Sequence, residues 1–294
     1  MPSPRELKTS LALFVASLGT MFWSWREEEA FTDPAAAWGA LAYTGALAAV
    51  ILSHEFAHYL VALRHGWRLS LPYFIPNPFA FGTFGAVIAL DGEPPNRTGL
   101  LEMAAAGPIA GALVSFALMA VGLHWTGPDT PPAPGEGISV LSNPPAMELL
   151  GRWLVGAVPG RYAELHPLAL AGWVGCLITG MNLVPLGQTD GGHIVNALWP
   201  QRALLVSRVT VGALVLAGLA WPGWALWAGI ALIFGFWRGL RVPAEPGLTA
   251  RGRWLAFAAL LVGALSFMPV PVEDERWERP HQRQPAATEV PGPK

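Results

Sequence analysis

Long stretches with almost no charge are the feature that most limits what this chain can fold into. A helix that spans a membrane needs roughly 17–25 apolar residues, and the second, third and fourth of these stretches reach that length. Only 13% of the chain is charged, about half the usual share of a soluble domain. The sequence therefore predicts an all-α polytopic membrane protein with about seven transmembrane helices, or six as the alternative. In chain order the stretches are Thr9–Trp25, Ala35–Leu63, Ala104–Leu123, Leu168–Leu186, Leu204–Ala220, Gly223–Trp237 and Trp254–Met268.

Two parts of this pattern allow more than one interpretation. The first stretch follows Arg5 and Lys8, as in a signal peptide, but no small-residue cleavage site comes cleanly after it, so we expect an uncleaved span. The fifth and sixth stretches are separated by Trp221-Pro222-Gly223-Trp224. That motif predicts either a tight turn or a proline kink within one long helix.

The predicted organisation has four parts. Residues 1–34 hold the first span and a loop, residues 35–200 form a membrane core, and residues 201–270 hold the last spans. Residues 271–294 are rich in Pro, Glu and Arg and predict a disordered tail. Within the core, the loop at 124–167 is rich in Pro and Gly, and Ala146–Val158 is expected to form a short amphipathic helix on the membrane surface.

Charge and cysteine content exclude several classes of function. The net charge of -2 excludes nucleic-acid binding that depends on a strongly basic chain. A single cysteine, Cys176, excludes an internal disulfide framework and any zinc module built on several cysteines. Arginine and lysine gather at the N-terminus and at the ends of the second and fourth spans, so we expect these ends to face the cytoplasm. The expected location is the plasma membrane.

The second span contains the motif His54-Glu55-Phe56-Ala57-His58. Histidines four residues apart share one face of a helix, so both imidazoles can bind one zinc ion. Glu55 can then take a proton from a water molecule at the metal. The alternative, two interfacial histidines beside a snorkelling glutamate, leaves unexplained why these groups interrupt an apolar span.

A zinc site of this kind needs a third protein ligand, and Asp190 is the best candidate. It lies just beyond the fourth span, on the same predicted membrane side as the two histidines. Pro185 and Gly187 predict unwound backbone there, and Gly191-Gly192 predict a sharp turn. An ordinary loop exit with a turn-forming Asp-Gly is the alternative.

Together these motifs resemble the site-2 protease family of intramembrane zinc metalloproteases. The resemblance rests on the HExxH motif inside a span and on NxxPxxxxDG from Asn182 to Gly191, and it covers roughly Ala35 to Leu198. Weaker agreement comes from the stretch 81–88, which resembles the family's membrane-associated hairpin, and from Ala106–Gly111, which resembles its AGPxxG helix start. Thr189 departs from the leucine that many relatives have just before Asp-Gly.

The resemblance implies a role for each matching residue. His54, His58 and Asp190 would hold one zinc ion per chain, and Glu55 would be the general base. Asn182 would contact the substrate or steady the oxyanion, and His193 would act from behind the ligands or on the transition state. Three residues of the hairpin would contact the substrate: Gly82, Phe84 and Gly85.

The segment near residues 69–90 predicts a membrane-associated β-hairpin. It is too rich in proline for a spanning helix and too apolar for an ordinary loop. A helical substrate must unwind before its backbone can be cut, and the edge of such a hairpin can pair with an extended strand. The alternative is a hairpin that only shields the site.

The expected function is therefore hydrolysis of a peptide bond within or near the membrane segment of a single-span substrate, in a lipid membrane and without nucleic acid. The loop at 124–167 and the tail are too short for the PDZ or CBS domains found in some relatives. The main alternative is a non-catalytic zinc-binding membrane regulator. A zinc transporter, or a zinc protease with a downstream ExxxE-type ligand, fits less well.

Overall fold

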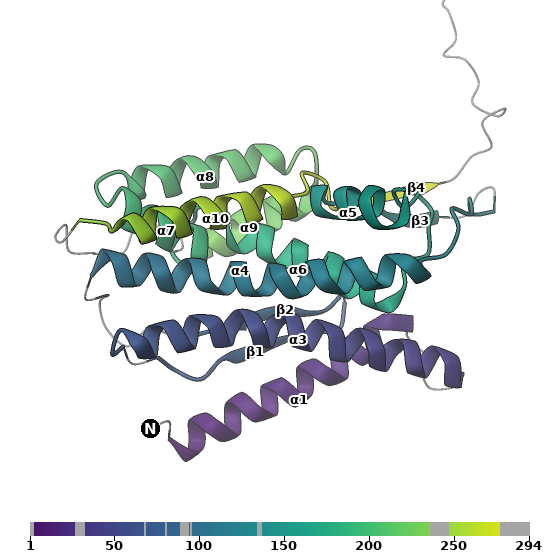
Figure 1. Cartoon of the computed structure of the whole chain (residues 1–294), viewed down its shortest axis with the longest axis horizontal. Helices are drawn as coiled ribbons and strands as arrows, with labels where there is room; N and C mark the ends of the chain where they lie inside the picture. The colour runs from purple at the N-terminus through teal and green to yellow at the C-terminus, as the bar shows by residue number, and fades with distance from the viewer. Residues whose placement is uncertain are drawn as a thin grey trace, which may run out of the picture.

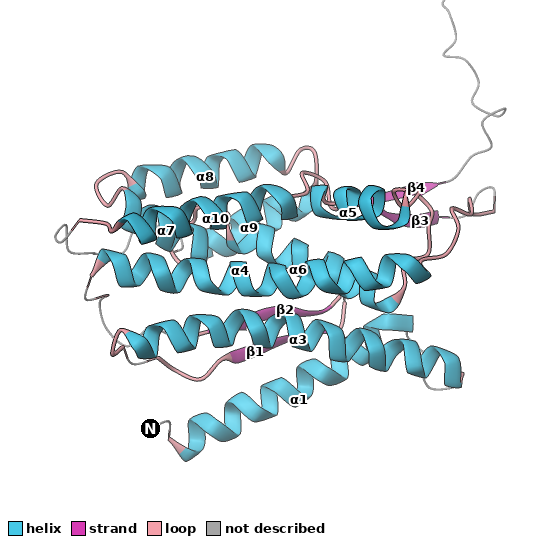
Figure 2. Cartoon of the chain, viewed as in Figure 1, coloured by secondary structure: helices cyan, strands magenta, loops and turns pink. Residues whose placement is uncertain are grey.

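The computed structural model describes residues 3–26, 33–67, 69–79, 81–88, 94, 96–133, 137–233, 235 and 247–276. Most of these residues form helices that lie side by side, with two small sheets beside them (Figures 1 and 2). The longer helices are α1 (Pro4–Arg26), α3 (Pro34–Arg64), α4 (Arg97–Gly122), α6 (Pro167–Asn182), α8 (Ala203–Ala217), α9 (Pro222–Ile233) and α10 (Ala250–Ser266). The shorter ones are η1 (Leu123–Trp125), α5 (Pro145–Leu150), η2 (Gly151–Val155) and α7 (Asp190–Leu198). The strands are β1 (Tyr73–Asn77), β2 (Gly82–Val87), β3 (Gly137–Leu141) and β4 (Val272–Arg276).

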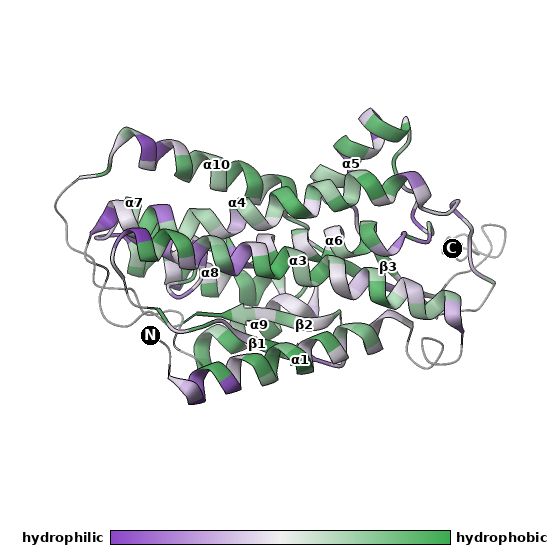
Figure 3. Ribbon diagram, turned by 60° about the horizontal axis from the view of Figure 1, so that its bottom comes forward, coloured by the Kyte–Doolittle hydropathy of each residue, from purple (hydrophilic) through white to green (hydrophobic). Residues whose placement is uncertain are grey.

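Each predicted apolar stretch contains a helix. Two helical segments among the described residues, Pro34–Arg64 and Arg97–Trp125, are long and apolar enough to cross a membrane. Apolar residues run along the helices, and hydrophilic residues gather at ends such as the start of α1 and of α10 (Figure 3). The mostly helical class is confirmed, whereas a total of six or seven spans stays a prediction.

Helix α4 lies at the centre and packs against α3, α6, α7 and α10. Small residues let these helices approach closely. A Cβ atom added at Gly175 of α6 would collide with the Ser115 hydroxyl of α4 and lie 2.9 Å from Val50 Cγ1 of α3. Glycine at this position therefore lets three helix backbones meet without a gap.

The start of α4 differs from the prediction. The helix begins at Arg97, because the Asn96 side chain caps it by accepting a hydrogen bond from the Gly99 N–H at 2.7 Å. Ala106–Gly111 therefore lies in the helix interior and is not a helix start, and Pro108 is an internal proline. An apolar count misses the first turns because they carry Arg97 and Glu102.

The fifth and sixth stretches form two helices, α8 and α9, and not one kinked helix. Helix α8 ends at Ala217 and α9 begins at Pro222, whose missing N–H and fixed φ suit the first turn of a helix. Residues 234 and 236–237, at the end of the sixth stretch, lie outside the described residues.

The predicted hairpin is present as β1 and β2, which pair antiparallel with a register shift between Phe74 and Pro76. Helix α1 packs across both strands. The Ser10 hydroxyl donates to the Pro72 carbonyl at 2.7 Å, and the Thr20 hydroxyl donates to the Gly82 carbonyl at 2.6 Å. These bonds tie α1 to the hairpin backbone at both ends.

A second two-stranded sheet was not expected. Strand β3, in the loop at 124–167, pairs antiparallel with β4, which lies at the start of the predicted disordered tail. The prediction of disorder was therefore wrong for Val272–Arg276; residues 277–294 lie outside the described part. The predicted helix at Ala146–Val158 is found as α5 followed by the π-helical turn η2.

The packing at Gly175 generates a stability test. Gly175→Ala should lower the unfolding temperature, because overpacking a tight core costs about 1–3 kcal/mol. Gly212→Ala in α8 is the matched control, because a Cβ atom there meets nothing within 4 Å and alanine favours helix. Thermal unfolding of both variants in detergent decides; equal unfolding temperatures would contradict the packing described here.

Candidate metal centre

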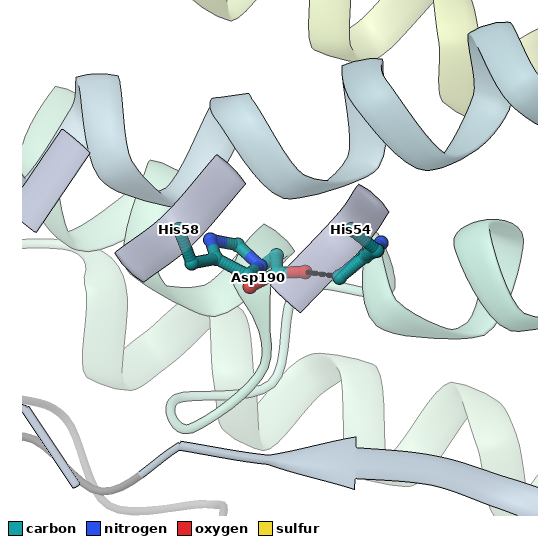
Figure 4. Close-up of side chains that lie close together, drawn as sticks. All are labelled: His54, His58 and Asp190. Atoms are coloured by element: carbon teal, nitrogen blue, oxygen red, sulfur yellow. Dashed lines mark hydrogen bonds and ion pairs between the residues drawn. The ribbon is translucent and has the colours of Figure 1, made fainter. Parts of the chain in front are cut away.

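Helix α3 places His54 and His58 one turn apart on the same face, and Asp190 lies between their rings (Figure 4). The His54 Nε2 atom is 3.2 Å from Asp190 Oδ2, and the His58 Nε2 atom is 3.3 Å from Asp190 Oδ1. Each carboxylate oxygen therefore faces one imidazole. The structure thus brings Asp190 to the two histidines of the other motif, which precede it by more than a hundred positions in the sequence.

Helix α4 orients the second histidine. The Nδ1 atom of His58 is 2.8 Å from the Met103 carbonyl oxygen, which can only accept a hydrogen bond. Nδ1 must therefore carry a proton, which leaves Nε2 as the nitrogen that can bind a metal. A backbone carbonyl behind a ligand histidine is the usual way in which a protein sets this tautomer.

Two glycines on α4 make room for the two imidazoles. A Cβ atom added at Gly107 would collide with the His58 ring, and one added at Gly111 would lie 3.1 Å from His54 Nδ1. The glycines are four residues apart, as the histidines are, so each faces one ring across the helix interface. Their spacing therefore fixes how deeply both rings can sit between α3 and α4.

The backbone around Asp190 is built to bring its carboxylate against α3. Thr189 caps α7: its hydroxyl accepts from the Gly192 N–H at 3.2 Å and lies 2.9 Å from the Leu186 carbonyl. Gly191 and Gly192 are helical and do not form the predicted sharp turn. A Cβ atom at either position would collide with the Leu183 or Leu186 carbonyl, so glycine is needed for close packing.

The donor set fits zinc. The three ligand atoms lie within 4.8 Å of one another, and two imidazole nitrogens with one carboxylate are a known tripod for a catalytic zinc ion. His54 and His58 are 4% and 7% exposed. Burial of such a polar cluster is costly unless its members are paired or hold an ion.

Glu55 connects this cluster to a cavity. Its side chain is buried on α3, and it lines a cavity of about 180 Å³ between α1, α3 and the approach to β1. The other lining residues are mostly apolar: Leu7, Ser10, Leu11, Phe14, Leu52, Phe56, Tyr59, Leu71, Pro72 and Phe74. A carboxylate at the wall of an apolar cavity, next to three metal-binding groups, is suited to proton transfer.

Two more predicted site residues lie nearby. The Asn182 Nδ2 atom, at the end of α6, is 3.5 Å from His54 Nε2. His193 lies on α7, one turn after Asp190, and is 8% exposed. Neither ring nitrogen of His193 has a hydrogen-bond partner among the described residues. A buried imidazole without partners requires an explanation, and a role toward the site is one.

The hairpin residues predicted to contact substrate fall into two groups. Gly82 faces α1, since a Cβ atom there would collide with the Met21 backbone. Phe84 is exposed, and Gly85 has a φ of +91°, which favours glycine. Phe84 is therefore open to a partner, whereas Gly82 is covered by α1 and Gly85 is buried.

Sequence reasoning missed what α4 contributes. Neither the Met103 carbonyl nor the role of Gly107 and Gly111 as space for the rings was expected. A signal was present, because Gly107 and Gly111 repeat the four-residue spacing of His54 and His58. Matching the two spacings would have paired the helices.

Comparison with known proteins gives the same family as the motifs. The sequence model of peptidase family M50 matches residues 42–220. The chain is 34% identical over 242 residues to "Probable zinc metalloprotease EGY1, chloroplastic" of Arabidopsis thaliana, covering 75% of this chain and 41% of that protein. It is 33% identical over 238 residues to "Probable zinc metalloprotease EGY2, chloroplastic" of Oryza sativa subsp. indica, covering 76% and 42%.

A more distant relative is "Probable zinc metallopeptidase EGY3, chloroplastic" of Arabidopsis thaliana, 26% identical over 76% of this chain and 41% of that protein. The chain thus spans about two fifths of the length of the curated relatives it matches. No solved structure matches it.

The contact between α4 and the histidines generates a metal-binding test. Gly107→Ala should lower the zinc content of the purified protein severalfold or more, because the added methyl group displaces the His58 ring and disturbing a group behind a ligand costs about 10–100-fold in affinity. Gly45→Ala on α3 is the control, because its Cβ atom meets nothing within 4 Å. Full zinc content in Gly107→Ala would show that the ring is not held in this way.

The cap at Thr189 generates a second test. Thr189→Val removes the hydroxyl that accepts from Gly192 and should lower zinc content together with thermal stability, by about 1 kcal/mol as for other lost caps. Thr189→Ser keeps the hydroxyl and should behave as wild type. Wild-type zinc content and stability in Thr189→Val would contradict the role of the hydroxyl as the cap.

Proposed function

The chain belongs to peptidase family M50, and from that premise we propose that it is an intramembrane zinc metalloprotease. Its substrate would be a membrane protein, cut within or near a membrane-spanning segment. The observation that carries the proposal is the convergence of His54, His58 and Asp190 beside Glu55, at the wall of an apolar cavity.

His54 and His58 would hold zinc through their Nε2 atoms, and Asp190 through its carboxylate. Zinc held there supplies a water molecule with a lowered pKa and polarises a carbonyl group. The Met103 carbonyl keeps the His58 ring in the tautomer that presents Nε2.

Glu55 would move the proton. Its carboxylate accepts a proton from the attacking water and delivers it to the nitrogen of the leaving amine. Burial on α3 keeps this carboxylate beside the three ligand residues. Asn182 has an amide group near His54 that can donate to the developing oxyanion on the substrate carbonyl.

The cavity beside Glu55 supports a membrane-derived substrate. Its wall is almost entirely apolar, as a site for the side chains of an unwound membrane segment must be. The hairpin β1–β2 runs along the same side of α3, under α1. An extended substrate segment can pair with its backbone, which satisfies amide groups that the substrate exposes when its helix unwinds.

The proposed location is a multi-pass position in a membrane, the plasma membrane by our expectation. The N-terminus and the site would face the cytoplasm, as the distribution of Arg and Lys indicates. Water would reach the site from that side.

The role of Glu55 is tested with a charge-removing variant. Glu55→Gln should keep the zinc content of wild type and lower cleavage of a model single-span substrate by about 10²–10⁴-fold, the usual contribution of a general base. Glu148→Gln is the matched control, because Glu148 is partly exposed and pairs with Arg152 in the next turn. Zinc and cleavage are measured on the same detergent-purified samples.

Cleavage by Glu55→Gln at the wild-type rate would remove Glu55 from the mechanism. Zinc bound by every sample without cleavage in any would favour a non-catalytic zinc-binding membrane regulator.

A further inference from the structure

A second cavity lies at the opposite end of the helices from Arg64 and Arg97. It has a volume of about 360 Å³, within the usual range of ligand pockets. One wall is strand β3 and the facing wall is the segment from Gly160 to Leu165. Trp25, at the end of α1, and Leu170 of α6 complete it. In Figure 1 this end of the molecule carries the labels β3 and β4.

Strand β3 presents a free edge on the side away from β4. The Ser142 N–H donates to the Pro271 carbonyl at 2.9 Å, so this pair is hydrogen-bonded across the sheet. Hydrogen-bonded and non-hydrogen-bonded pairs alternate in an antiparallel ladder. The N–H and C=O groups of Ser139 and Leu141 therefore point away from β4, and no described residue bonds to them.

Proteins usually blunt such an edge with charge, proline or a covering loop. Here the nearby charges are already engaged: Arg161 pairs with Glu273 at 2.5 Å, and the Asp274 carboxylate accepts from the Ser139 hydroxyl at 2.7 Å. The first contact joins Arg161 to β4, the second joins β3 to β4, and neither uses the outward backbone groups of β3.

A chain of contacts joins this cavity to the hairpin beside the proposed active site. Phe81, at the turn between β1 and β2, packs on the Trp173 ring with centroids 5.2 Å apart. Trp173 Nε1 donates to the Ser142 carbonyl at 2.7 Å, directly after β3. The Tyr43 hydroxyl donates to the Phe81 carbonyl at 2.7 Å, and Tyr43 packs on Trp25 of the cavity wall. The hairpin thus ends where the second cavity begins.

The two cavities lie along one helix. Phe14 of α1 lines the cavity beside Glu55, and Trp25 lines the second one. Between these residues α1 advances about 16 Å at 1.5 Å per residue. An extended peptide covers that distance with about five residues. A substrate segment that leaves the first cavity along the hairpin therefore reaches β3 after one short strand.

We propose that the second cavity is a binding site for the flank of the substrate, the extended segment just beyond the membrane-spanning part on the side away from Arg64. This proposal rests on the proposed protease function. The flank adds a strand to the free edge of β3 through Ser139 and Leu141. Its side chains enter the cavity. The lining of that cavity combines polar residues such as Thr130 and Asn143 with the apolar residues Trp25 and Leu170. Selection of substrates would then depend on this flank as well as on the membrane segment.

Binding can be measured without turnover in the Glu55→Gln protein. The probe is a fluorescent single-span peptide with a flank of about ten residues at each end, enough for one strand. Two shortened peptides each lack one flank. Three proteins are compared by fluorescence anisotropy in detergent: Glu55→Gln alone, with Ser139→Pro, and with Ser139→Ala. Proline removes an N–H group that the ladder with β4 does not use, whereas alanine removes only the hydroxyl bond to Asp274.

We expect removal of one of the two flanks, the one that lies on the side away from Arg64, to weaken peptide binding about tenfold. This is the effect of one or two net hydrogen bonds. This loss should appear with Ser139 and with Ser139→Ala. It should be absent with Ser139→Pro, which should already bind the complete peptide as weakly as the shortened one. As a test on the peptide side, a flank with proline at alternate positions should bind no better than no flank.

The proposed site would be overturned if removal of the flank weakened peptide binding equally in all three proteins, or in none of them, even if the protein cleaves its substrate. A change of oligomeric state in Ser139→Pro without a change in peptide binding would assign the edge to contacts between copies of the chain and would also overturn it. A protein that binds none of the peptides would contradict both this proposal and the proposed function.

Discussion

The structure depends on one interaction, the meeting of two imidazoles and one carboxylate between helices α3, α4 and α7. His54 and His58 come from one face of α3, and Asp190 comes from the first turn of α7 and faces both rings at 3.2 and 3.3 Å. These polar groups lie among apolar helices, where unpaired polar atoms are costly. The three side chains can meet only if the backbones of α3, α4 and α7 come close to one another, and the residues around the site allow that close approach.

Glycine supplies that approach. Gly107 and Gly111 open α4 opposite the two rings, and Gly191 and Gly192 let α7 pack on the carbonyls of Leu183 and Leu186. Glu55 is buried on α3 next to His54 and also lines the cavity formed with α1 and β1. Helix α3 thus supplies both histidines of the metal centre and a carboxylate at the wall of the cavity that would receive a substrate.

Much of this could be predicted from sequence, and the limits have physical causes. The apolar stretches predicted the long helices because burial of apolar residues dominates their formation. The motifs predicted His54, His58 and Asp190 because the two histidines are close in sequence and Asp190 stands in a longer motif with a recognisable pattern.

Other features were missed. The start of α4 was missed because its first turns are polar. Strand β4 was missed because an acidic, proline-rich composition resembles that of a disordered segment, while the strand depends on pairing with β3, more than a hundred residues away. Gly191-Gly192 was misread as a turn because glycine serves turns and close helix packing equally well. Thr189 was seen only as a departure from the family pattern, whereas the structure uses its hydroxyl as the cap of α7.

Zinc K-edge X-ray absorption on the purified wild-type protein tests the ligand set directly. We expect one zinc per chain in a shell of nitrogen and oxygen atoms at about 2.0–2.2 Å, with the outer scattering of two imidazoles and no sulfur. The same spectrum should lose its protein-bound shell in Asp190→Ala. A sulfur neighbour, a single imidazole, or an unchanged spectrum in Asp190→Ala would contradict the assignment of His54, His58 and Asp190 as the ligands.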